Sequence, residues 1–155
     1  HKAIRRQRQM CIRDRYNINP CNINLEITES ALMEDKTNLL DNMNRLMEYG
    51  VKFSLDDFGT GHSNLNYIVD MPVNIVKFDK GMLDAYFENG RAKYVMDAAM
   101  HMIQGMKLEI VAEGIETKEH FENIAKLGIN FVQGYYFSKP VTARQFLLFI
   151  NENNK

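Results

Sequence analysis

Apolar runs and amphipathic stretches alternate along this chain from residue 22 to residue 150. Short apolar runs typical of strands occur at residues 22–27, 51–55, 74–78, 108–112 and 131–133. Segments with helical character lie between and after them, at residues 36–49, 63–69, 91–104, 117–128 and 142–150. Regular alternation of strands and helices is typical of parallel strands joined by helical crossovers. The pattern therefore predicts an α/β fold.

Apolar stripes and capping residues indicate where the longer helices lie. The stripe in residues 36–49 consists of Leu39, Leu40, Met43, Leu46 and Met47. Gly50 follows it at the position of a C-cap glycine. The expected buried face in residues 91–104 consists of Val95, Ala98, Ala99, Met102 and Ile103. Thr117 is the expected N-cap of the next helix, although His120 stands where a capping box would have Glu or Gln.

Two architectures fit five parallel strands: a doubly wound sheet or a (β/α)8 barrel. No glycine-rich phosphate loop of the GxGxxG or Walker type follows any of the strands. This absence weakens the nucleotide-binding version of the doubly wound sheet. No linker or internal repeat divides the region, so it is one domain or part of one.

Composition places the chain among ordinary globular proteins. Its 155 residues are 45% hydrophobic and 25% charged, with a formal net charge of -1. The near-zero charge argues against a protein that binds a nucleic-acid polymer through a broad basic face. Cys11 and Cys21 have no metal-ligand spacing, and two cysteines do not indicate a disulfide scaffold. With no apolar run near the ~20 residues that cross a bilayer, we expect a cytoplasmic location and no membrane contact from this segment.

Residues 1–15 differ from the rest of the chain. They carry six basic residues against the single acid Asp14 and show no helical period. A basic nucleic-acid or membrane arm and an unstructured end are two interpretations. The third, which we favour, is that residues 10–15 (MCIRDR) resemble translated sequencing-adapter sequence. On that interpretation residues 1–15 are not native, and a domain begins at residue 16.

Polar residues collect at or just after the carboxyl end of each apolar run. They are Glu26, Glu29, Asp56, Asp57, Lys77, Asp79, Glu113, Glu116 and Gln133. In an α/β fold these strand ends share one face, and the catalytic residues of a barrel come from the ends of several strands. Several carboxylates cannot stay ionised side by side without a compensating charge. Oxygen ligands without a cysteine or histidine cluster favour Mg²⁺, Mn²⁺ or Ca²⁺, so the pattern indicates metal-assisted hydrolysis of a phosphoester.

A single acid at a strand end can also be a helix cap or a solvated loop residue. We prefer that interpretation for Asp84, Glu88, Asp97 and Glu109. Asp56 and Asp57 are different, because 58–61 (FGTG) makes a tight loop directly after them. Glu113 is likewise followed by a glycine, which permits close approach of another group.

Five segments carry a specific resemblance. They are residues 25–30 (LEITES), 56–61 (DDFGTG), 76–79 (VKFD), 111–116 (VAEGIE) and 133–140 (QGYYFSKP). In this order they resemble the EAL-domain family of cyclic di-GMP phosphodiesterases, over roughly residues 16–150. The resemblance implies a TIM-like barrel, of which about five of the eight strands are present in a domain spanning residues 16–155. It also implies hydrolysis of cyclic di-GMP to linear pGpG with two Mg²⁺ or Mn²⁺ ions.

The resemblance also implies a role for each matching residue. Glu26, Asp56 and Asp57 would be metal ligands, with Asp56 bridging both ions. The catalytic residues would be Lys77 at the nucleophilic water or an oxygen at the metal, Glu113 as general base, and Gln133 orienting water or phosphate. Glu116 would support the site. Glu29 would anchor the loop formed by Phe58, Gly59, Thr60, Gly61 and the following residues, which in the family also shapes a homodimer contact.

The sequence departs from the family pattern upstream. The glutamate of the Glu-Ala-Leu motif and a metal-binding asparagine have no counterpart here. A full barrel takes about 250 residues, so we expect this chain to be inactive alone and its open sheet edge to favour pairing with another chain. The alternative function is a non-catalytic EAL domain that binds cyclic di-GMP or a protein partner. A third is a barrel hydrolase acting on another phosphodiester.

Overall fold

The computed structural model describes residues 16–28, 30–31, 36–59, 66–88 and 90–153. The strands are β1 (Asn24–Thr28), β2 (Lys52–Phe58), β3 (Ile75–Phe78), β4 (Glu109–Ala112) and β5 (Phe131–Val132). The α-helices are α3 (Lys36–Met47), α4 (Asn66–Val69), α5 (Lys80–Phe87), α6 (Arg91–Gly105), α7 (Lys118–Ile124) and α8 (Ala143–Asn153). Two 3-10 helices, η1 (Pro20–Asn22) and η2 (Ala125–Leu127), complete the described elements.

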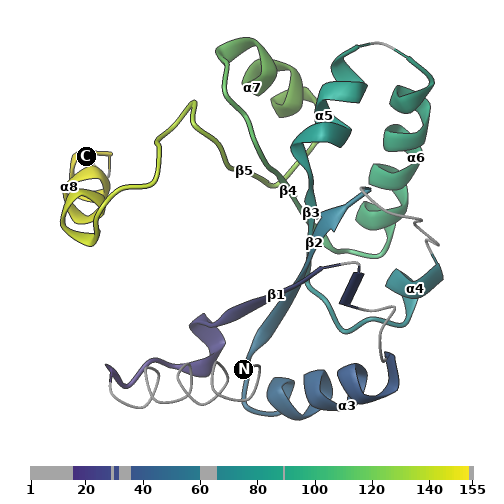
Figure 1. Cartoon of the computed structure of the whole chain (residues 1–155), viewed down its shortest axis with the longest axis vertical. Helices are drawn as coiled ribbons and strands as arrows, with labels where there is room; N and C mark the ends of the chain where they lie inside the picture. Colours follow the sequence, from purple (N-terminus) through teal and green to yellow (C-terminus); the bar gives the residue numbers. More distant parts are fainter. Residues whose placement is uncertain (1–15, 29, 32–35, 60–65, 89, 154–155) are drawn as a thin grey trace.

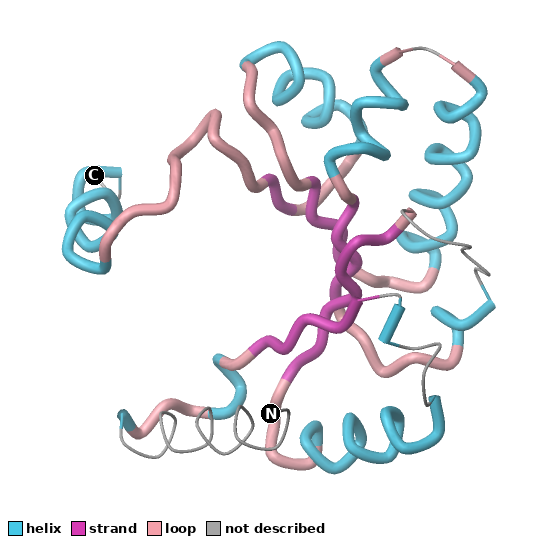
Figure 2. Tube along the Cα trace, in the orientation of Figure 1, coloured by secondary structure: helices cyan, strands magenta, loops and turns pink. Residues whose placement is uncertain are grey.

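The strands form one parallel sheet in the order β1-β2-β3-β4-β5. Sequential neighbours in a parallel sheet require a crossover after each strand, and helices supply it here. The sheet curves into an arc in Figure 1, with α3, α4, α5, α6 and α7 outside it. Figure 2 shows that the concave side of the arc is open and that α8 lies across this opening, away from the strands. The α/β fold predicted from the sequence is therefore confirmed.

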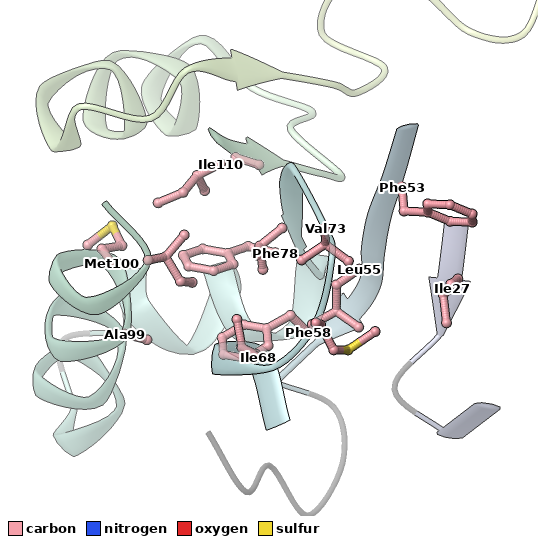
Figure 3. Packing of buried hydrophobic residues seen from close by; sticks show 14 of the residues in the cluster. Ile27, Phe53, Leu55, Phe58, Ile68, Val73, Phe78, Ala99, Met100 and Ile110 are labelled. Carbon is pink, nitrogen blue, oxygen red and sulfur yellow. The ribbon is translucent and has the colours of Figure 1, made fainter. Parts of the chain in front are cut away.

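The core lies between the convex face of the sheet and the helices that cover it (Figure 3). Leu55, Val76, Phe78 and Ile110 on the central strands are fully buried. They meet the buried face of α6, which consists of Met96, Ala99, Met100 and Ile103. Burial of such side chains is worth about 1.5–3 kcal/mol each, so this packing fixes the three central strands whose ends carry the polar residues.

Some local predictions are confirmed and others are wrong. Gly50 adopts a φ of 93° after α3, and Thr117 Oγ1 accepts a hydrogen bond from His120 N. The expected face of α6 was misplaced, because Val95 is 66% exposed. Helix α5 is not predicted by the sequence pattern. It begins directly after Asp79, whose carboxylate accepts a hydrogen bond from Gly81 N at 2.6 Å.

Within the described residues, no helix combines the length and the apolar character needed to cross a bilayer.

Candidate functional site

One buried lysine lies at the centre of the predicted site. Lys77 on β3 has a side chain that is only 9% exposed, and its Nζ contacts three carboxylates. The Nζ atom lies 2.7 Å from Glu26 Oε1, 2.9 Å from Asp56 Oδ1 and 2.8 Å from Glu113 Oε1. Glu26 comes from β1, Asp56 from β2 and Glu113 from the residue after β4. Four sequence-predicted residues from four separate segments therefore meet at one point.

The parallel register explains why these residues meet. Glu26 stands beside Ser54 on β2, two residues before Asp56, and Lys77 stands beside Val111 on β4, two residues before Glu113. Residues two apart on a strand share a face. Glu113 N donates to Phe78 O at 3.0 Å, which extends the pairing of β3 and β4 past the end of β4. The charged side chains therefore project from the concave face, opposite the apolar core.

Strand β2 contains a bulge at the two adjacent residues Asp56 and Asp57. Leu55 is opposite Val76 and Phe58 is opposite Phe78, so β2 holds one more residue than β3 in this interval. Such an extra residue re-aims the side chains around it. Phe58 is thereby buried and stacks on Phe78 with the ring centroids 5.5 Å apart, while Asp56 contacts Lys77. At the bulge, the backbone of Asp57 adopts a φ of 56°.

The strand predicted over residues 51–55 continues to Phe58, so its predicted end is wrong. Phe58 and Gly59 of the expected loop are described, and Gly59 has a φ of 95°. A Cβ at Gly59 would lie 2.6 Å from Met82 Sδ. Glu29, Thr60 and Gly61 lie outside the described residues, so their expected roles stay predictions.

The three carboxylates keep Lys77 charged. Burial alone would lower the pKa of its amine, but the charged contacts with Glu113, Glu26 and Asp56 outweigh it and raise the pKa above its ordinary value. Lys77 is therefore a permanent cation at physiological pH. One ammonium balances only one of the three negative charges that contact it, so the cluster retains an excess of negative charge.

One oxygen of the cluster has unused hydrogen-bonding capacity. Asp56 Oδ1 is buried and accepts no hydrogen bond, although Lys77 Nζ lies at ion-pair distance from it. A buried carboxylate oxygen in this state attracts a cation or a donor. In the part of the chain that the structure describes, no three His, Cys, Asp or Glu side chains are already grouped as a metal centre. The negative excess of the cluster and the buried carboxylate of Asp56 fit a divalent cation.

Glu116, the predicted supporting residue, pairs outside this cluster. Its Oε1 lies 2.7 Å from Lys80 Nζ, and both side chains are about half exposed. The Lys80 side chain lowers the pKa of Glu116, and Glu116 raises the pKa of Lys80. Gly114, with a φ of 71°, lies against the aliphatic stem of Lys80, where a Cβ would come within 2.6 Å of it. No local sequence signal marks Lys80 as part of the site, because its partner is 36 positions away in the sequence.

Gln133 lies one residue beyond β5 with an exposed side chain. Its backbone N donates to Ala112 O at 2.8 Å, and its carbonyl accepts from Ile115 N at 3.1 Å. A Cβ added at the following residue, Gly134, would overlap the carbonyl oxygen of Ile115. These contacts fix the backbone of Gln133 at the same edge of the sheet as Glu113.

The sequence and the fold both match known proteins. The sequence model of the EAL domain family matches residues 2–140, a range that includes most of the segment 1–15. The chain is 40% identical over 123 residues to the oxygen sensor protein DosP of Escherichia coli K12, covering 79% of this chain and 15% of DosP. It is 39% identical over 132 residues to the probable cyclic di-GMP phosphodiesterase PdeB of the same organism, covering 85% of this chain and 25% of PdeB.

Solved structures of EAL proteins superpose on this fold. The cAMP-bound EAL enzyme Bd1971 gives a TM-score of 0.83 at 35% identity, covering 92% of this chain and 38% of that chain. The PaMucR phosphodiesterase in complex with c-di-GMP gives a TM-score of 0.79 at 34% identity, covering 86% of this chain and 54% of that chain. The manganese and cyclic di-GMP complex of Klebsiella pneumoniae BlrP1 gives a TM-score of 0.74 at 25% identity, covering 80% of this chain and 32% of that chain. This chain belongs to the EAL domain family, whose fold is TIM-barrel-like, and spans a minor part of the length of these curated relatives.

Proposed function

We propose that this chain is part of an EAL domain that hydrolyses cyclic di-GMP to linear pGpG in a reaction that depends on divalent metal ions. The observation that carries the proposal is the contact of Lys77 Nζ with Glu26, Asp56 and Glu113 at 2.7 to 2.9 Å. An ammonium among clustered carboxylates provides positive charge for a phosphate oxygen and oxygen ligands for hard cations. Relatives named as cyclic di-GMP phosphodiesterases and neighbours crystallised with c-di-GMP support this substrate.

The proposed metal ligands are Glu26, Asp56 and Asp57. Asp56 supports this role because its buried Oδ1 accepts no hydrogen bond and is balanced only in part by the Lys77 ammonium 2.9 Å away. Bound Mg²⁺ or Mn²⁺ would supply charge neutralisation of the phosphodiester and activation of water. Neighbours crystallised with manganese or calcium beside cyclic di-GMP are consistent with a divalent cation. A homodimer contact through the loop after Asp57 is part of the same proposal.

The chain's own residues divide the remaining work. Lys77 stays protonated and holds a phosphate oxygen or the attacking water, while Glu113 accepts the proton of that water. The rigid support of Glu113, from its backbone bond to Phe78 and the glycine that follows it, keeps the carboxylate beside Lys77. Gln133 orients water or phosphate. Glu116 supports the segment that follows β4 through its ion pair with Lys80.

The test is hydrolysis of cyclic di-GMP by a protein in which this chain is joined to the remaining barrel units of a close relative. Product pGpG is followed by chromatography with Mg²⁺ or Mn²⁺ present. We expect product to disappear with Glu113→Gln and to persist with Glu109→Gln, an exposed residue of the same strand segment. Binding of the nucleotide without any product would assign the domain to the non-catalytic alternative and contradict the proposal.

A further inference from the structure

The first turn of α5 touches the segments that follow two other strands. The stem of Lys80 lies against Gly114, where an added Cβ would come 2.6 Å from Lys80 Cβ and 2.8 Å from its Cγ. Met82 lies against Gly59, where an added Cβ would come 2.6 Å from Met82 Sδ and 3.4 Å from its Cγ. Carbon atoms normally approach each other to about 3.5–4.0 Å. Neither glycine could therefore carry a side chain without displacing a side chain of α5.

These two glycines stand beside residues that the proposed reaction needs. Gly59 comes two residues after Asp57 on the β2 side, and Gly114 directly follows Glu113 on the β4 side. Their φ angles of 95° and 71° lie in the left-handed region that favours glycine. Both segments are thus brought against α5 by their backbone alone. A displacement of the first turn of α5 would reach the carboxylates on both sides.

Helix α5 is itself held firmly along its length. At its start, Asp79 Oδ1 accepts a hydrogen bond from Gly81 N at 2.6 Å. Leu83 in its middle is only 1% exposed and packs in the core. Phe87 at its end stacks on His120 of α7, with the ring centroids 4.4 Å apart. Because α5 also begins directly after β3, it is a rigid support beside the strand that carries the buried lysine.

The contacts of Lys77 show why the placement of these segments matters. Its Nζ lies 2.9 Å from Asp56 Oδ1 and 2.8 Å from Glu113 Oε1, so one ammonium contacts carboxylates from both sides. Reacting groups must be held to within about 0.5 Å of their productive geometry. We propose that Met82 and Lys80 are positioning residues, which hold the metal-binding carboxylates of β2 and the carboxylate of Glu113, respectively, in place around Lys77. The roles of these carboxylates rest on the proposed function.

The experiment compares variants of this chain joined to the remaining barrel units of a close relative. Met82→Ala removes the support of Gly59 and should weaken Mn²⁺ binding roughly tenfold, measured by electron paramagnetic resonance without nucleotide. Met82→Leu has a similar volume and should keep the Mn²⁺ affinity within about twofold of the parent. The matched control is Met102→Ala on α6, because Met102 is also partly buried against the core. It should change the Mn²⁺ affinity by less than about twofold.

Lys80→Ala tests the other side of the site. With Mn²⁺ saturating, it should lower kcat roughly tenfold and leave the KM for cyclic di-GMP within about twofold, because it displaces the base and not the binding groups. Exchange at the Glu113 amide, which donates to Phe78 O, should become roughly fivefold faster. Lys80→Arg keeps the stem and the charge and should retain kcat within about twofold. The control Lys118→Ala removes an exposed ion pair of α7 and should change neither quantity.

Several results would overturn the inference. Equal loss of Mn²⁺ affinity in the Met82→Ala and Met102→Ala proteins would do so, as would equal effects of Lys80→Ala and Lys118→Ala. A variant that lowers Mn²⁺ affinity and kcat alike would indicate general destabilisation and would also count against it. A parent protein that binds Mn²⁺ but leaves cyclic di-GMP intact would contradict the proposed function instead. The Mn²⁺ affinities and the Glu113 exchange rates would then still decide whether Met82 and Lys80 position these carboxylates.

Discussion

Replacing Lys77 with methionine tests the electrostatic account of the site. The methionine keeps most of the aliphatic stem and removes the ammonium that Glu26, Asp56 and Glu113 contact. Removing one partner of a fully buried ion pair costs about 3–5 kcal/mol, because the remaining charge is left uncompensated. Here Asp56 and Glu113 keep 20% of their side-chain area exposed and Glu26 keeps 52%, so water screens part of that penalty. We therefore expect the substitution to lower the free energy of unfolding by about 2 kcal/mol.

The assay is hydrogen exchange at the amide of Glu113, which donates to Phe78 O across β3 and β4. A loss of about 2 kcal/mol corresponds to roughly 30-fold lower protection at pH 8. The matched control is Lys118→Met, whose exposed pair with Glu122 is 3.5 Å long. Equal protection in the Lys77 variant and the parent at pH 8 would refute the reasoning.

Further predictions concern the site and its surroundings. Gly134→Ala should disrupt the pairing of β4 with β5, because its Cβ would overlap Ile115 O, and amide hydrogen exchange at Gln133 should become faster. The control Gly105→Ala has open space around it and should instead stabilise α6 by up to about 1 kcal/mol. Asp79→Ala should destabilise α5 by about 1 kcal/mol through loss of its N-cap, measured as faster exchange at Gly81, and Asp79→Asn should restore most of it. The lowered pKa of Glu116 means that its pairing with Lys80 stabilises the fold above the unfolded-state pKa of about 4.3 and is lost as pH falls through the lower folded value. The raised pKa of Lys77 means that its contribution is fully present below about pH 10.4 and is lost only at higher pH. Carbon-detected NMR titration of Glu116 and chemical denaturation across pH would check both, and an ordinary Glu116 pKa would contradict the first.

The sequence was enough to predict the strands and the residues that meet at Lys77. Apolar runs followed by acids mark the carboxyl ends of parallel strands, and parallel strands bring those ends together. The length of β2 was not predictable in this way, because a bulge within an apolar-acidic run leaves no separate signal. Its positive φ at Asp57 follows from pairing with β3 rather than from local propensity.

Features that depend on distant partners were also missed. The run from residue 80 to 87 contains Gly81 and has a weak apolar stripe, so its helix depends on the cap by Asp79 and on packing by Leu83. The stripe of α6 was displaced by one position, because apolar residues occur on both faces and only the sheet decides which face is buried. The pairing of Glu116 with Lys80 forms where the segment between β4 and α7 meets the first residue of α5.

The central claim is that the Lys77 cluster is a site for a divalent cation and a phosphodiester. The most direct measurement is anomalous scattering from crystals of this chain joined to the remaining barrel units of a close relative, grown with Mn²⁺ and cyclic di-GMP. The account predicts manganese at the carboxylate of Asp56 and a phosphate of the nucleotide beside Lys77. Manganese absent from Asp56 at saturating concentration, or a nucleotide bound away from Lys77, would contradict it.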